Sequence, residues 1–70
     1  MKKIIKINVN DKGFDVPENV TVQALVGLLK LDIKSTAVAV NKEIVPKSRY
    51  AYFRLKEDDK VDLVGIAPGG

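Results

Sequence analysis

The chain has 70 residues, of which 46% are hydrophobic and 30% charged, and its 12 basic and 9 acidic residues give a formal net charge of +3. This composition is typical of one small folded domain, and a chain of this size buries only about 60% of its unfolded surface, which leaves little room for a deep catalytic cavity. Cysteine and histidine are absent, which excludes disulfides, thiolate nucleophiles, imidazole bases and most transition-metal sites.

The N-terminus does not have the pattern of a leader or a membrane segment. The stretch MKKIIKINVN begins with basic residues, as a signal peptide does, but Lys6, Asn8 and Asn10 interrupt its apolar residues. No apolar run in the sequence reaches the roughly 20 residues that span a bilayer. We therefore expect a cytoplasmic protein that does not enter a membrane.

The first predicted element is a β-hairpin. Apolar and polar residues alternate in KIIKINV at 3–9, which is typical of a half-buried strand. The stretch NDKG at 10–13 has turn composition, and FDV at 14–16 predicts a second strand that ends at Pro17.

The period then changes to that of a helix in VTVQALVGLLK at 20–30. Thr21 is a suitable N-cap residue for this helix. Gly27 costs a helix about 1 kcal/mol relative to alanine, and a close crossing over a strand would explain its presence. The apolar stripe of the predicted helix consists of Val22, Leu25, Val26 and Leu29.

A second hairpin follows the helix. TAVAV at 36–40 predicts a strand, Asn41 and Lys42 a tight turn, and EIV at 43–45 the partner strand, which Pro46 ends.

The C-terminal part of the chain is less regular. KSRYAYFRL at 47–55 is expected to be irregular or a single turn, with Tyr52 or Phe53 and Leu55 on the core, and KEDDK at 56–60 to be a charged turn. VDLVGI at 61–66 predicts the last strand.

The order β-β-α-β-β-β predicts an α+β protein with a mixed sheet of four to five strands packed on one main helix. The last strand is expected to lie parallel beside the first, which is the ubiquitin-like β-grasp arrangement. A small open barrel is the alternative, but it would leave the amphipathic helix unused. We expect this domain to span 1–66 and a flexible Gly-Gly tail to span 67–70. The expected core residues are Ile5, Ile7, Val38, Val40, Val61 and Leu63 on the sheet, facing the helical stripe.

The stretch VAVNKEIVPKSRYAYFRLKEDDKVDLVGIAPGG resembles the C-terminal half of the thiamin-pathway sulfur carrier proteins, the ThiS family. INVNDKGFDVPENVTVQALVGLL resembles the family's hairpin and leucine-rich helix, so the resemblance covers nearly the whole chain. The chain departs from the family pattern at Tyr50, where tryptophan is usual, and in KEDDK, which lacks the usual glycine. It also departs in the bulky YFRL and at Pro68, which belongs to the tail itself.

The resemblance implies a protein that carries sulfur on its own C-terminus and is not itself an enzyme. A ThiF-like, E1-like adenylating enzyme would activate the Gly70 carboxylate with ATP, and sulfur would then replace AMP to give a thiocarboxylate. A ThiG-like thiazole synthase would take that sulfur for the thiazole ring of thiamin. Pro68 and Gly69 would enter the partner's active site with Gly70, and the carrier itself would bind no cofactor and no metal.

A partner must also contact the folded domain. Strand alternation places Ile4, Val64 and Ile66 on the face away from the helix, where they predict a docking patch that Arg49 and Arg54 could rim. Scattered exposed apolar residues without a function are an equally acceptable interpretation.

The sequence is also compatible with other functions. The same chemistry could serve molybdopterin, cysteine or methionine synthesis, or the chain could be a ubiquitin-like protein-binding module. Nucleic-acid binding is disfavoured because the lysines form no stripe and most stretches are interrupted by acidic residues. Catalysis by Asp58 and Asp59 is rejected, because adjacent carboxylates in a charged turn are ordinarily solvated.

Overall fold

A computed structural model of the protein describes residues 3–66. Its strands and main helix follow the predicted order. A short 3-10 helix after β4 forms the predicted single turn, and a second 3-10 helix before β3 was not predicted. The elements are β1 (Ile4–Val9), β2 (Lys12–Pro17), α1 (Val22–Leu28), η1 (Ile33–Ser35), β3 (Thr36–Val40), β4 (Glu43–Ile44), η2 (Lys47–Arg49) and β5 (Lys60–Gly65).

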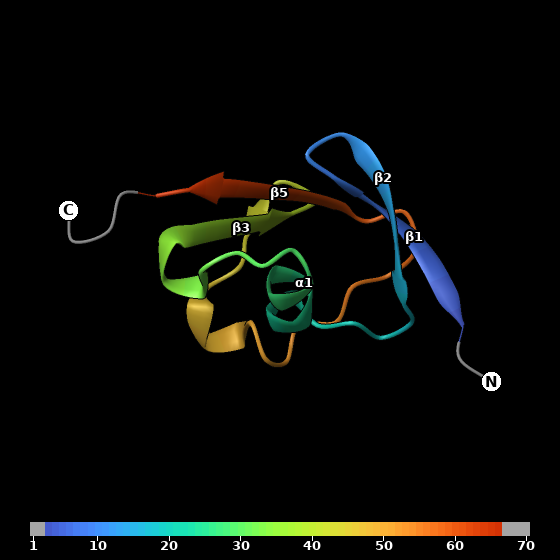
Figure 1. The fold of residues 1–70 in the computed structure, drawn as a ribbon, viewed down its shortest axis with the longest axis horizontal. Coiled ribbons are helices and arrows are strands. Elements are labelled where there is room, and N and C mark those ends of the chain that lie inside the picture. The colour runs from blue at the N-terminus through green and yellow to red at the C-terminus, as the bar shows by residue number, and fades with distance from the viewer. Residues whose placement is uncertain (1–2, 67–70) are drawn as a thin grey trace.

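The strands form one mixed sheet in the order β2-β1-β5-β3-β4. β5 runs parallel to β1 and antiparallel to β3, so the last strand lies in the middle of the sheet. Helix α1 covers one face of this sheet, below β3 and β5 in Figure 1. The predicted ubiquitin-like β-grasp is therefore confirmed, and the open barrel is not formed.

Two matching turns connect the hairpin strands. Asn10 and Asp11 have φ of 50° and 67°, and Asn41 and Lys42 have φ of 52° and 70°. Positive φ at both central residues is the type I′ pattern, which matches the twist of the flanking strands. The turns predicted from NDKG and from Asn41-Lys42 are confirmed.

Both turn asparagines also hold β5. The Leu63 amide donates to Asn10 Oδ1 at 2.9 Å, and the Lys60 amide donates to Asn41 Oδ1 at 3.0 Å. Asn10 thus continues the contact between the first hairpin and β5 after β1 has ended. Each hairpin anchors the central strand through a side chain at its own turn.

Helix α1 begins after the predicted N-cap residue. The Ala24 amide donates to Thr21 Oγ1 at 3.1 Å, which confirms the predicted cap.

The core fills the space between the sheet and α1. Leu29 and Leu63 are partly buried against the core rather than enclosed by it. The other predicted core residues, Ile5, Ile7, Val22, Leu25, Val26, Val38, Val40 and Val61, are all buried.

The segment after β4 places Phe53 and Leu55 on the core, as predicted, and adds a buried ring that was not predicted. Tyr50 is the buried ring, at 2% exposure, and its hydroxyl donates to the Thr36 carbonyl at 3.3 Å. Phe53 packs partly against the core, as expected, but Tyr52 is 79% exposed. The Arg49 carbonyl accepts from the amides of both Tyr52 and Phe53, and this tight turn directs Tyr50 inward.

Gly27 is not explained by a close helix–strand crossing. A Cβ built at this position would meet nothing within 4 Å, and the residue is exposed. The expectation of a close approach is therefore wrong, and the glycine weakens α1 without a packing reason.

Candidate docking site at the end of strand β5

The site that the sequence predicts lies where β5 leaves the sheet. Pro68, Gly69 and Gly70 lie outside the described residues, so the structure is informative only about the surface that leads to them. The Ile66 amide donates to the Ser35 carbonyl at 2.8 Å, which holds the chain against the sheet as far as residue 66.

An apolar surface covers the outer face of the sheet at this end. Val64 is in register with Ala37, and Ile44 on the edge strand is in register with Ala39. Because residues directly opposite each other point to the same side of a sheet, these four side chains share the face away from α1. Ile66, two residues beyond Val64, continues this face by strand alternation. We call these five residues the outer apolar face.

The exposed fractions show how open this face is. Ile44 is 80% exposed, Val64 58% and Ile66 42%. Ile44 is not among the residues of the docking patch predicted from the sequence. Its neighbour Val45 is buried, so alternation along EIV was the signal that could have placed Ile44 outward.

Ile4 does not belong to this surface, although it is 58% exposed. The parallel register places Asn8 beside Lys60, so Ile4 lies before the start of β5, whereas Val64 lies near its end. Eight residue rises separate the two positions along the strands, or about 26 Å. Figure 1 shows the start of β1 and the end of β5 at opposite ends of the molecule. The prediction of one patch containing both residues is wrong.

Arg49 and Arg54 do not rim the outer apolar face either. Arg54 forms an isolated antiparallel bridge with Thr21, the N-cap of α1, and thus lies on the helix side of the sheet. The two arginines instead meet each other, with Tyr52 and Phe53, around a hollow of about 270 Å³.

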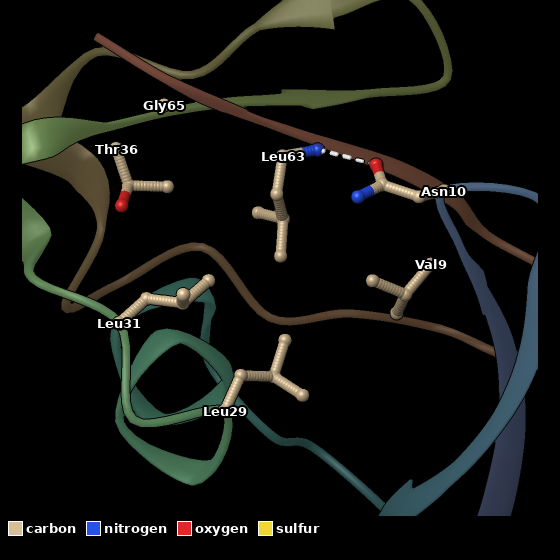
Figure 2. Close-up of a pocket in the computed structure, with 7 residues that line it drawn as sticks. All are labelled: Val9, Asn10, Leu29, Leu31, Thr36, Leu63 and Gly65. Carbon is tan, nitrogen blue, oxygen red and sulfur yellow. Dashed lines mark hydrogen bonds between the residues drawn. The ribbon is translucent and has the colours of Figure 1, made fainter. Parts of the chain in front are cut away.

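A second hollow lies beneath β5, between the sheet and the end of α1. Its volume is about 390 Å³, and Figure 2 shows the side chains of Leu29, Leu31 and Leu63 directed into it. The remaining lining residues are Val9, Asn10, Thr36 and Gly65. We call this space the inner hollow.

Two of the polar groups of the inner hollow have hydrogen-bond partners within the chain. Thr36 Oγ1 donates to the Asp32 carbonyl at 2.7 Å, and Asn10 Oδ1 accepts from the Leu63 amide. The apolar part of the lining can therefore accept an apolar side chain, and Asn10 Nδ2 makes none of the side-chain hydrogen bonds found among residues 3–66.

Asp59, one of the two adjacent carboxylates in the charged stretch at 56–60, has a structural role. Asp59 accepts hydrogen bonds from the Lys56 amide at 2.8 Å and from Asn41 Nδ2 at 3.1 Å, so it closes a turn. Within residues 3–66, no three His, Cys, Asp or Glu side chains gather as a metal site would require. The helices of the same part of the chain are too short or too polar to cross a membrane.

Comparison with known proteins identifies the family. A model of the ThiS family matches residues 2–70. A thiazole synthase from Paramagnetospirillum magneticum is 38% identical over 66 residues, which cover 94% of this chain but 20% of that protein. The chain thus spans about a fifth of that relative's length. The uncharacterized protein ycf40 of Porphyra purpurea is 26% identical over 70 residues, which cover 100% of this chain and 99% of that protein.

Solved structures agree with the family match. A crystal structure of the thiamine biosynthesis protein ThiS from Geobacter metallireducens superposes with a TM-score of 0.82 at 25% identity, and covers 94% of this chain and 100% of that one. A solution structure of a thiamine biosynthesis protein from the same organism gives a TM-score of 0.76 at 25% identity, covering 94% of this chain and 88% of that one. Since the family model matches the sequence from residue 2 to Gly70 and the β-grasp superposes on a solved ThiS structure, the chain belongs to the ThiS family.

Proposed function

We propose that this protein is a sulfur carrier for thiamin biosynthesis, with sulfur held as a thiocarboxylate on the C-terminal Gly70. The observation that carries the proposal is the ThiS family match, which extends through the Gly-Gly end. The protein is then a co-substrate of other enzymes, acting in the cytoplasm, and the described surface serves to present its end to them.

The chemistry starts from an unreactive group. A C-terminal carboxylate has a reference pKa of about 3.3–3.7, so it is ionised at neutral pH and resists nucleophiles. A ThiF-like adenylating enzyme uses ATP to convert it into an acyl adenylate, with loss of pyrophosphate. Sulfide (HS⁻) then attacks the acyl carbon, the bond to AMP breaks so that AMP leaves, and loss of the remaining proton gives the thiocarboxylate anion. The resulting thiocarboxylate is a soft nucleophile that requires no cysteine in the carrier.

The residues of the tail suit passage into an active site. Gly69 and Gly70 have no side chains, so an extended backbone can pass through a narrow channel without a clash. Pro68 reduces the conformational freedom of the free tail, which lowers the entropy cost of ordering it in the partner.

The outer apolar face supplies the second part of the partner contact. It lies at the end of β5, directly beside the point where the chain leaves the sheet, and the inner hollow opens on the opposite side of the same strand. Exposed apolar patches of this kind mark protein interaction sites. A ThiG-like thiazole synthase as partner is supported by the relative of that name, which carries a region similar to this chain.

The test of the function is the intact mass of the protein after incubation with ATP, a ThiF-like enzyme and sulfide. We expect a mass gain equal to the exchange of one oxygen for sulfur, localised to Gly70. Gly70→Ala should fold normally and lose most of this loading, because its methyl group lies beside the reacting carbonyl. No mass change with several such enzymes would leave a ubiquitin-like binding module as the better interpretation. Loading followed by sulfur transfer to a molybdopterin synthase, rather than to thiazole synthase, would assign another pathway.

Two substitutions at equally exposed positions test the docking surface. Val64 and Ile4 are both 58% exposed on the same side of the sheet, but they lie at its opposite ends. Val64→Asp should raise the KM of the adenylating enzyme for this protein at least tenfold, whereas Ile4→Asp should change that KM less than twofold. Equal effects of the two variants would remove the outer apolar face from the proposal and leave the tail chemistry untouched.

A further inference from the structure

The positive charge of the chain is concentrated in one segment. KSRYAYFRLK at 47–56 contains four basic residues and no acidic residue, whereas the other sixty residues contain eight basic and nine acidic residues. The formal charge is thus +4 within the segment and −1 in the rest of the chain. A local excess of this kind attracts an oppositely charged surface, and the net charge of +3 alone did not reveal it.

Four residues of this segment line a hollow on the protein surface. The hollow of about 270 Å³ described above is lined by Arg49, Tyr52, Phe53 and Arg54, and we call these residues the basic-aromatic hollow. Tyr52 is 79% exposed, and Phe53 packs partly against the core. Among residues 3–66, no side-chain hydrogen bond involves either guanidinium group. Both arginines are exposed, and Arg54 also lines a neighbouring hollow together with Glu43 and Asp59.

The backbone beneath the hollow is fixed, although it is not a regular helix or strand. The Val22 amide donates to the Phe53 carbonyl at 2.9 Å, and the Gln23 amide donates to the Tyr50 carbonyl at 3.0 Å. These bonds tie both ends of the turn to the start of α1. Because the backbone is already ordered, binding has to immobilise only the exposed side chains.

We propose that the basic-aromatic hollow binds an acidic segment of a partner protein. A carboxylate would pair with the Arg49 and Arg54 guanidinium groups, and an adjacent apolar or aromatic side chain would pack on Tyr52 and Phe53. Guanidinium groups bind carboxylates through paired charge-assisted hydrogen bonds, and tyrosine and arginine are enriched among residues that dominate binding energy. The hollow lies on the helix side of the sheet, so this contact is separate from the outer apolar face and does not depend on sulfur chemistry.

A nucleic acid fits the same site less well. Proteins that bind single strands use a basic groove about 4–16 nucleotides long, with several rings for successive bases. Here, one largely exposed ring and two guanidinium groups surround one hollow of about 270 Å³. That volume suits one or two side chains.

Amide chemical shifts of the full chain, titrated with a defined probe, test the proposal. The probe is the blocked peptide Glu-Glu-Phe-Asp-Glu, and a ten-nucleotide uridylate is titrated in parallel. We expect shifts centred on Arg49, Tyr52 and Arg54 with the peptide. The double variant R49Q/R54Q should raise the peptide Kd at least tenfold.

A control variant removes the same charge elsewhere. Lys3 and Lys12 are exposed in the first hairpin region, and K3Q/K12Q should change the peptide Kd less than twofold. Tyr52→Ala should weaken binding at least threefold, with the fold preserved because this ring is exposed. Absent peptide shifts, equal losses in the two double variants, or tighter uridylate binding at these residues would each overturn the proposal. None of these outcomes affects sulfur loading at Gly70, so the two proposals fail separately.

Discussion

Replacement of Asn10 by alanine removes two stabilising features at once. Its φ of 50° lies in the left-handed region, which costs alanine about 1–2 kcal/mol. Its Oδ1 accepts the hydrogen bond from the Leu63 amide at 2.9 Å, and such a bond contributes about 1 kcal/mol net. We therefore expect Asn10→Ala to lower the free energy of unfolding by about 2–3 kcal/mol.

This loss is large for so small a protein. At about 0.05–0.15 kcal/mol per residue, the total free energy of unfolding is about 3.5–10 kcal/mol. One kcal/mol shifts the melting temperature of a domain this size by about 4–8 °C, so Asn10→Ala should lower it by about 8–24 °C. Urea unfolding followed by circular dichroism measures the free energy. Hydrogen exchange at the Leu63 amide reports the broken bond directly and should become faster.

Asn19 provides the control that separates the two contributions. Its φ of 66° is also left-handed, but its side chain takes no part in the hydrogen bonds found among residues 3–66. Asn19→Ala should therefore cost only the backbone contribution of about 1–2 kcal/mol. Asn10→Gly should cost less than Asn10→Ala, because glycine adopts this φ without strain. If Asn10→Ala were no more destabilising than Asn19→Ala, the side-chain bond to β5 would contribute nothing and the reasoning would fail.

Other substitutions test the helix, the core and the second turn. Gly27→Ala should stabilise the protein by about 1 kcal/mol, because the helix gains a better former and the new Cβ meets nothing within 4 Å; an unchanged or lower melting temperature would contradict this. Tyr50→Phe should cost about 1 kcal/mol through the lost bond to the Thr36 carbonyl, whereas Tyr50→Ala should cost about 3–5 kcal/mol through the cavity; equal losses in urea unfolding would show that the ring is not the packing element. Lys42→Gly should raise the free energy of unfolding by up to about 1 kcal/mol, because φ is 70° there, and a measured decrease would show that this strain is relieved elsewhere.

Most of the fold could be predicted because its signals are local. Alternation in KIIKINV fixes which side chains of β1 face the core, and the period of Val22, Leu25 and Val26 does the same for α1. Asparagine at the first position of each two-residue turn tolerates the left-handed conformation that the hairpins require. Each of these features depends on residues that are close together in the sequence, so the sequence alone is enough to predict it.

The surfaces could not be predicted because they depend on register between distant strands. Ile4 and Val64 both point outward, as alternation predicts, but only the parallel pairing of Asn8 with Lys60 shows that they lie far apart. The inward direction of Tyr50 results from the turn around the Arg49 carbonyl, for which KSRYAYFRL has no periodic signal. The same turn brings Arg49 and Arg54 together. Outside a regular helix, no spacing rule predicts a contact between residues five positions apart.

The central place of β5 has a consequence for synthesis on the ribosome. The hairpins β1–β2 and β3–β4 have no shared neighbour until residues 60–65 have left the exit tunnel, because β5 is the strand that joins them. Pairing β5 with β1 closes a loop of about fifty residues, a long-range step that is expected to be slow. A chain interrupted before Lys60 would hold two separate hairpins instead of a shortened domain. The nascent protein thus completes its sheet only when β5 has been made, a few residues before Gly70, and a chain that ends before β5 leaves the strand edges of both hairpins open to proteolysis.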